Sequence, residues 1–261
     1  MERTRLFRRG RPLKRWRYVG VFSEELMACA ALVQVGPARQ AFWAVYERRE
    51  DVLRERTHTL LRRSAVELPR GRMRIRDAGL ELDFALDEGA GFEVRCPHGR
   101  GEVWTRKQAG IRARGALTLD GGASRPVDAR AVIDDTAGYH ARHTEWWWAA
   151  GVGSSPDGAE LAWNLVSGVN DPATGSERAV WIDGEPTEAP SVSFSADLRK
   201  IHDREAHELR FHAEAERRRR ENLLVIRSDY RAPFGSFSGT LPGGVALAHG
   251  FGVVEHHRAV W

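Results

Sequence analysis

Apolar and polar residues alternate along most of the chain, and this pattern predicts short β-strands. Residues 15–22, 26–35 and 40–48 are the first three such stretches, and others follow at intervals of roughly ten residues. Glycine, proline or aspartate separates them, without the spacing of an amphipathic helix. This pattern is typical of antiparallel sandwiches and barrels. We therefore expect an all-β fold with few or no helices, built as two antiparallel barrels or sandwiches packed side by side.

One turn-forming stretch divides the predicted strands into two groups. Residues 120–126 read Asp-Gly-Gly-Ala-Ser-Arg-Pro and form the longest run of turn residues before the middle of the chain. We expect an N-terminal lobe over residues 15–120 and a C-terminal lobe over residues 127–261. A basic lead-in covers residues 1–14.

The stretch at residues 142–150 is the densest in groups that can do chemistry. As a strand it places His143, Glu145 and Trp147 on one face and two further tryptophans on the other. Aromatic residues favour strands, and in a helix the three adjacent tryptophans would spread around the cylinder. A strand that is bulky on both faces is usually buried on both. His143 and Glu145 then form either a wall of a pocket or a buried polar pair.

Composition places the chain among soluble globular proteins. It has 261 residues, of which 42% are hydrophobic and 29% charged. The longest apolar run, at residues 26–35, is about half the length of a membrane helix. The basic start leads into no apolar segment of the kind found in signal peptides. With only Cys29 and Cys96 as cysteines, we expect a cytoplasmic protein without an integral membrane segment. The sequence leaves the oligomeric state open.

The positive charge is concentrated at the N-terminus. Residues 1–17 carry a net charge of +7 against +4 for the whole chain, so the remainder is slightly acidic. A second basic run, Arg217 to Arg220, is predicted to lie at the tip of a hairpin as a solvated turn. No aromatic residue stands beside it for base stacking. We expect no nucleic-acid partner.

Two polar clusters are candidates for chemistry. One is Asp134, Asp135, His140, His143 and Glu145; the other is Glu255, His256 and His257. A metal needs three or four converging ligands, but neighbouring residues of a strand point to opposite faces, so we expect no metal. Nucleotide-binding and serine-hydrolase motifs are missing, and we expect no cofactor. A Glu and a His across a cavity can act as acid and base. Otherwise such groups stabilise the fold or line a pocket without chemistry.

We expect the two clusters to meet, because an unpaired buried polar group costs about 1 to 3 kcal/mol. His143 and Glu145 share a face of their strand, as do Glu255 and His257. The candidate catalytic residues are His143, Glu145, Glu255 and His257, and the candidate ligand-binding residues include Trp147 and Asn164.

Several motifs are spread over the chain. They are Lys14-Arg-Trp-Arg-Tyr18, Gly138-Tyr-x-x-Arg142, Thr144-x-Trp146-x-Trp148-Ala149, Asn164-Leu-x-x-Gly168, Glu177 followed by Trp181-x-Asp-Gly184, and Gly250-x-Gly-Val-x-Glu255-x-His-x-x-x-Trp261. Together they resemble the bacterial domain-of-unknown-function family 2804. The resemblance adds Trp181 and Asp183 to the candidate ligand-binding residues. Arg178 is a departure, because an Asn usually follows the Glu in that family.

The strand pattern of this family is similar to that of two-domain lipocalin-like proteins, which include carotenoid hydratases and pericyclase-type cyclases. This resemblance implies two lipocalin-like lobes that hold a long apolar molecule between them. We expect a protein that binds a lipid-like or isoprenoid-like molecule there. The alternative is a hydratase, isomerase or cyclase that uses a His/Glu acid–base pair. Polar groups bonded only to backbone favour binding, whereas a carboxylate facing a His across a void favours catalysis.

Overall fold

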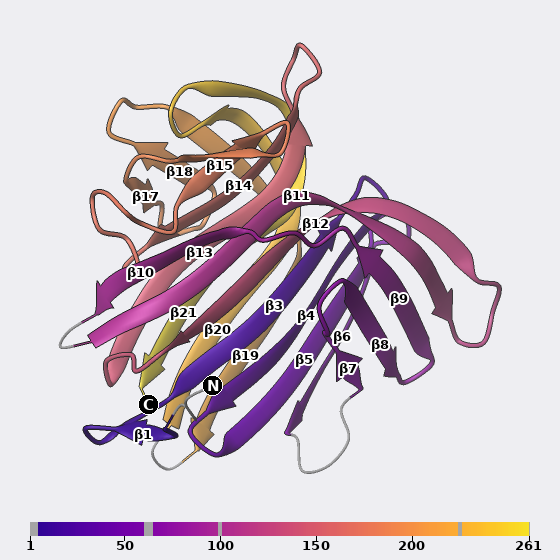
Figure 1. Ribbon diagram of the computed structural model, residues 1–261. Coiled ribbons are helices and arrows are strands. Elements are labelled where there is room, and N and C mark those ends of the chain that lie inside the picture. Colours follow the sequence, from indigo (N-terminus) through magenta and orange to yellow (C-terminus); the bar gives the residue numbers. More distant parts are fainter. Residues whose placement is uncertain (1–4, 60–64, 99–100, 224–225, 261) are drawn as a thin grey trace.

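Two curved antiparallel sheets lie side by side in the computed structural model of the protein (Figure 1). The structure describes residues 5–59, 65–98, 101–223 and 226–260. Strands form all the regular structure in these ranges, which confirms the predicted all-β fold of two lipocalin-like lobes; each lobe is a sheet curled into a half-barrel. None of the described residues belongs to a helix that could span a membrane.

The first sheet has ten strands in the order β6-β5-β4-β3-β12-β11-β9-β8-β7, with β10 also paired to β11. A separate small hairpin, β1 and β2, precedes it. The bounds are β1 (Phe7–Arg8), β2 (Arg11–Pro12), β3 (Lys14–Phe22), β4 (Leu26–Val35), β5 (Ala38–Glu47), β6 (Val52–Thr59), β7 (Val66–Glu67), β8 (Arg72–Asp77), β9 (Leu80–Leu86), β10 (Phe92–His98), β11 (Gly101–Leu119) and β12 (Arg125–Gly138).

The second sheet has nine strands in the order β16-β15-β14-β13-β21-β20-β19-β18-β17. Its central strands are long, and Figure 1 shows β19, β20 and β21 running beside β3, β4 and β5 of the first sheet. The bounds are β13 (His143–Ser154), β14 (Glu160–Ser167), β15 (Ala179–Ile182), β16 (Glu185–Glu188), β17 (Val192–Phe194), β18 (Lys200–Asp203), β19 (Glu208–Leu223), β20 (Ile226–Leu241) and β21 (Val245–Val260).

The chain crosses from the first sheet to the second at residues 139–142. A boundary at residues 120–126 is predicted from the sequence, but residues 120–124 form the turn between β11 and β12, and both strands belong to the first sheet. A glycine-rich hairpin turn and a linker between lobes have the same composition. The distinction depends on strand pairing, which local composition does not specify.

Alternating side chains give the molecule three hydrophobic cores. In β3, Val19 and Val21 face the core of the first lobe, whereas Tyr18 and Phe22 face a core between the sheets. The second lobe has its own core around Trp163. Each large apolar side chain that is fully buried contributes about 1.5 to 3 kcal/mol. The strands between the lobes are therefore apolar on both faces over much of their length. For residues 142–150 the predicted burial on both faces is only partly right, because His143 is exposed.

A bulge in β11 brings this strand against the second lobe. The register with β12 shifts between Ala109 and Ile111, and Gly110 has a φ of +77° that residues with a side chain rarely adopt. A Cβ at Gly110 would also lie 3.2 Å from the Cβ of Ala162 on β14. The glycine therefore serves both the bend and the close approach of the two lobes.

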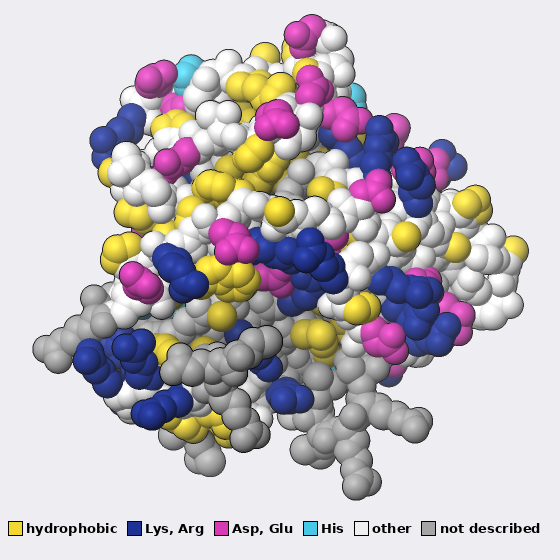
Figure 2. Space-filling model, in the orientation of Figure 1, with side chains coloured by type: hydrophobic (Ala, Val, Ile, Leu, Met, Phe, Trp, Pro, Cys, Tyr) yellow, Lys and Arg dark blue, Asp and Glu magenta, His cyan; other side chains and the backbone are white. Residues whose placement is uncertain are grey.

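Charged side chains pair with one another within the first sheet and also between the lobes, as Arg48 does with Glu214 of β19. Arg17 and Arg106 both bind the fully buried Glu88, and both also bind Asp135. Basic and acidic side chains lie close together over the face drawn in Figure 2. Asp134, next to Asp135 on β12, points to the opposite face and lines the space between the sheets.

Candidate functional site

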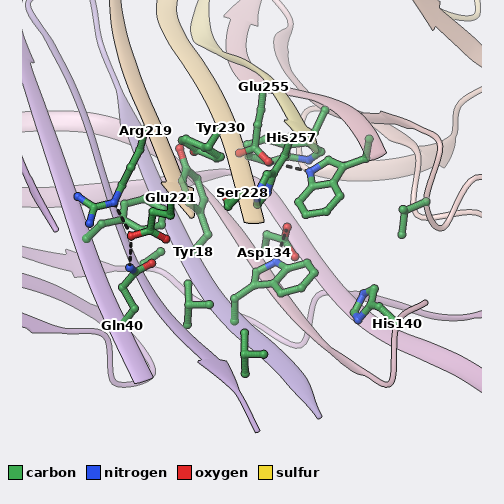
Figure 3. Close-up of a pocket in the computed structure, with 18 of the residues that line it drawn as sticks. Tyr18, Gln40, Asp134, His140, Arg219, Glu221, Ser228, Tyr230, Glu255 and His257 are labelled. Carbon is green, nitrogen blue, oxygen red and sulfur yellow. Dashed lines mark hydrogen bonds and ion pairs between the residues drawn. The ribbon is translucent and has the colours of Figure 1, made fainter. Parts of the chain in front are cut away.

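A cavity of about 240 Å³ lies between the two sheets. Strands β3, β4 and β5 form one wall, and β13, β19, β20 and β21 form the other (Figure 3). The lining is mostly apolar and aromatic and includes Trp16, Phe42, Trp146 and Trp148. A few polar side chains point into it, an arrangement typical of sites for small apolar molecules.

Glu255 is a buried carboxyl in the wall formed by β21. Its Oε1 accepts a hydrogen bond from Trp146 Nε1 at 2.7 Å, and the hydroxyl of Tyr230 is a second partner. Burial raises the pKa of Glu255 to about 7, although both hydrogen bonds oppose this shift. At neutral pH the group therefore exists in both protonation states and is able to give or accept a proton.

His257 lies two residues beyond Glu255 and lines the same cavity. Its Nε2 is 2.8 Å from Ser228 Oγ, and its ring packs edge-on against Trp146 with 4.4 Å between the centroids. Burial, together with the charge of His256, lowers the pKa of His257 to about 3. The imidazole is therefore neutral near pH 7.

A buried ion triad borders the cavity. Lys107 Nζ lies 2.7 Å from Asp134 Oδ1 and 3.2 Å from Glu177 Oε1. Burial disfavours the charged lysine, but the two carboxylates outweigh it and raise the pKa of Lys107. Burial raises the pKa of Glu177. Asn170 Nδ2 donates to Glu177 Oε2 at 2.9 Å, so the triad also fixes a residue that lines the cavity.

The arginine run of β19 is not a solvated hairpin tip, and that prediction is wrong. Arg217 is 4% exposed and lies over the ring of Phe42 at 4.2 Å, while its Nη2 donates to Thr57 Oγ1 at 2.7 Å. The run belongs to a strand, so alternate arginines face the first sheet. Arg219 also lines the cavity and binds Glu221.

The predicted pairing of the central and C-terminal strands is confirmed. Strands β13 and β21 are antiparallel neighbours over the whole length of β13. Trp146 lies opposite His257 and Trp148 opposite Glu255, on the cavity side. His143 and Glu145 therefore lie on the strand next to Glu255, His256 and His257, whereas Asp134 and Asp135 lie on β12.

The expected contact of His143 and Glu145 with Glu255 or His257 is wrong. Glu145 lies opposite Arg258 on the other face, and its Oε1 accepts hydrogen bonds from Arg258 Nε at 2.7 Å and His256 Nε2 at 2.8 Å. His143 is exposed. The parity within each strand was correct, but a shift of one residue in register reverses which faces meet.

The four candidate ligand-binding residues lie outside the cavity lining. Trp147 stacks on His256 on the far face of β13, with 4.7 Å between centroids. Asn164 is buried between Trp148 Nε1 and the carbonyl of Glu177, and so supports the wall from behind. Trp181 packs in the core between the sheets. Asp183 lies in the β15–β16 turn, with a φ of +50°.

Arg178, the departure from the family pattern, is also structural. It is 1% exposed, and its Nη2 donates to the carbonyl of Pro172 at 2.7 Å. Its guanidinium thus holds the loop that follows β14, and no cavity-lining role falls to it.

Several cavity residues were not identified from the sequence, above all Tyr18, Tyr230 and Arg217. Each side chain has a large apolar part besides its polar group. The alternating pattern of a strand therefore does not distinguish it from a core residue. Lys107 is recognisable in the sequence as one of three lysines in the chain. In the structure it lies opposite Asp134 in the β11–β12 pair. Among the described residues, no three His, Cys, Asp or Glu side chains are grouped as metal ligands.

The chain belongs to the family described as "Domain of unknown function (DUF2804)", whose model matches residues 72–261. No curated protein matches it. Two solved structures share its fold: a putative AttH from Nitrosomonas europaea and kievitone hydratase from Nectria haematococca. Both have a TM-score of 0.59, 13% sequence identity and 93% coverage of this chain, with coverage of 91% and 88% of their own chains. At this identity the similarity concerns the fold alone.

Proposed function

We propose that this member of the DUF2804 family is an enzyme that binds an apolar molecule between its lobes and transfers a proton to or from it through Glu255. One observation supports the proposal most directly: a carboxyl with a pKa of about 7 lies in the wall of a largely apolar cavity, beside a neutral imidazole. General acids and bases work best when their pKa lies near the working pH.

The groups around Glu255 suit both halves of a proton transfer. The apolar surroundings favour the protonated form before transfer, and the bonds from Trp146 and Tyr230 stabilise the carboxylate afterwards. Ser228 holds the neutral imidazole of His257 in the cavity wall, next to the ring of Trp146. Asp134 adds negative charge nearby and helps to retain the proton on Glu255.

Addition of water to a carbon–carbon double bond is the reaction that these positions suit best. Glu255 gives its proton to one carbon, water attacks the other, and the surplus proton of that water returns to the carboxylate of Glu255, directly or through solvent. Glu255 is thereby restored to its starting state. Protonation followed by proton loss at another carbon would give isomerisation instead. Kievitone hydratase, one of the proteins with the same fold, is by its name an enzyme of the first kind.

A carrier without chemistry is the second candidate. The observation that favours it is the apolar lining of the cavity, which suits retention of a lipid-like or isoprenoid-like molecule regardless of any reaction. The two candidates differ in what happens to the bound molecule and in whether the proton of Glu255 matters.

One experiment separates them. Wild type, Glu255→Gln and Glu145→Gln are incubated with an apolar extract of the native cells in H₂¹⁸O and in D₂O, and the extract is compared by mass spectrometry. Wild type is expected to convert at least one compound with uptake of solvent isotope. Glu255→Gln is expected to be slower by about 10²-fold or more, whereas Glu145→Gln, outside the cavity, keeps the wild-type rate.

Other outcomes decide against catalysis. Equal conversion by wild type and Glu255→Gln would reject the role of Glu255. A compound that stays bound in native mass spectra but never changes would support the carrier. Neither binding nor conversion by wild type would reject both functions.

A further inference from the structure

His140 is a buried histidine that the proposed proton transfer does not use. It lies in the crossover between β12 and β13, is 2% exposed and lines the cavity. Its ring packs against Trp16, with 5.3 Å between centroids. Figure 3 places His140 on the opposite side of the cavity from Gln40, Arg219 and Glu221.

The ring nitrogens of His140 lack partners. Within the described part of the chain, neither Nδ1 nor Nε2 makes a hydrogen bond of normal geometry. Burial, with the nearby charge of Lys14, lowers the pKa of His140 to about 3, although the backbone of Gly138 acts weakly in the other direction. Lys14 itself donates to the backbone carbonyls of His140 and Ala141. The ring is thus neutral, with one donor and one acceptor that no side chain of the described residues engages.

A second unused acceptor lies near this histidine. Asn170 lines the cavity, and its buried Oδ1 has no partner among the described residues, while Nδ2 is held by Glu177. Cys96 and His98 stand two residues apart on β10; Cys96 Sγ contacts the carbonyl of Asn170, and the ring of His98 packs against that of His140 at 5.4 Å. Two residues of a strand span about 7 Å, so the two cavity residues lie at the same end.

The charges at this end are close to balanced. Asp134 and Glu177 share the ammonium of Lys107, and Lys14 lies against the backbone of His140 and Ala141. Asp134 is also 3.3 Å from Trp16 Nε1, and Trp16 packs on His140. The neutral imidazole brings no charge that would compensate a buried carboxylate for its lost hydration. A hydroxyl group suits the site, because it accepts from an imidazole N–H and donates to Asn170 Oδ1 or to the second ring nitrogen.

We propose that His140 and Asn170 bind a hydroxyl group at one end of the apolar ligand. The site then takes an apolar alcohol or phenol, with its hydroxyl at His140 and its hydrocarbon body running past Glu255 towards Gln40 and Arg219. This inference rests on the proposed function, which requires an apolar ligand in the cavity, and it adds the chemistry of the ligand's polar end.

Three probes of similar size test the inference: 1-decanol, methyl nonyl ether and decanoate. Their binding to the full chain is measured by titration calorimetry and by the rise in melting temperature. Wild type is expected to bind 1-decanol about tenfold more tightly than the ether, the value of one good hydrogen bond, and more tightly than decanoate.

Substitutions at His140 identify the anchor. His140→Phe and His140→Leu are expected to bind the ether as wild type does and to lose the preference for 1-decanol. Their melting temperatures should equal or exceed that of wild type, because the removed nitrogens have no protein partner. If His140 only stabilised the fold, both substitutions would instead lower the melting temperature. His143→Phe, at an exposed histidine, is the matched control and keeps the preference.

The results separate the inference from the proposed function. If wild type binds the ether as tightly as 1-decanol, or decanoate more tightly than both, the hydroxyl anchor is wrong while apolar binding stands. Retention of the preference in both His140 variants would likewise reject the anchor. If none of the three probes binds to wild type, the apolar-ligand function and the anchor are both rejected.

Discussion

Trp146 Nε1 donates a hydrogen bond to Glu255 Oε1 at 2.7 Å, from the central strand to the C-terminal strand. The contact lies on the cavity side of the β13–β21 pair, where Trp146 is opposite His257. It favours the charged carboxylate, whereas burial favours the neutral acid. The balance of these two effects places the pKa of Glu255 at about 7, and the proposed chemistry depends on it.

Replacing Glu255 should change how stability depends on pH. The pKa of Glu255 is raised from 4.5 to about 7 in the folded state, so between these values the folded protein binds more protons than the unfolded chain. The stabilisation from Glu255 is therefore complete below pH 4.5 and is lost as the pH rises to 7. Relative to Glu255→Gln, wild type should lose about 1 kcal/mol per pH unit over this range, measured by urea unfolding.

Wild type has to be compared with Glu255→Gln, because the buried histidines also make the stability depend on pH. Their effect covers an overlapping pH range and runs in the opposite direction. Their contribution is common to wild type and Glu255→Gln and cancels in the difference. A difference in unfolding free energy that stays constant from pH 4.5 to 7 would show that Glu255 has an ordinary pKa.

Lys107→Met should be among the most destabilising single substitutions in the cavity wall. It leaves Asp134 and Glu177 buried without their cation, and breaking a buried ion pair costs about 3 to 5 kcal/mol. Adding Glu177→Gln should recover part of this loss. The matched control is Lys200→Met, because Lys200 pairs with Glu208 at the surface, where such pairs contribute about 0 to 1 kcal/mol. Equal losses from the two lysine substitutions would contradict the structural role of the triad.

Glu145→Gln and Glu255→Gln should have separate effects, although the two residues lie on neighbouring strands. Glu145 faces away from the cavity and binds His256 and Arg258. Its substitution should leave the affinity for 1-decanol unchanged, within about twofold, as measured by calorimetry. A clear loss of affinity in Glu145→Gln would indicate that the ligand binds on the far face of β13.

His140→Phe should make the protein more resistant to acid. The pKa of His140 is lowered from 6.5 to about 3 in the folded state, so between these values the unfolded chain binds more protons. Wild type therefore loses stability as the pH falls from 6.5 to 3, by about 1 kcal/mol per pH unit from this residue. The variant should lack this contribution, and His143→Phe should retain it. Identical acid unfolding midpoints for His140→Phe and wild type would contradict the buried, neutral state.

The sequence predicted the strands and the approach of the central strand to the C-terminal strand, because period-two alternation and polar density are local properties. It did not predict the register between β13 and β21. Shifting the pairing by one residue exchanges Glu145 for Trp146 on the cavity face, and both arrangements satisfy the same alternation. The position of Arg217 was missed for a related reason: only pairing with the other sheet reveals that a charged strand residue stacks on Phe42.

The proposed chemistry requires that the Glu255 carboxyl titrates near neutral pH inside the ligand cavity. Infrared difference spectra of wild type and Glu255→Gln measure this titration through the carbonyl stretch of a protonated carboxyl. We expect a band that is present in wild type at pH 5, disappears with a midpoint near pH 7, shifts when 1-decanol binds and is missing from the variant. A band that has already disappeared by pH 5, or one that 1-decanol leaves unchanged, would contradict it.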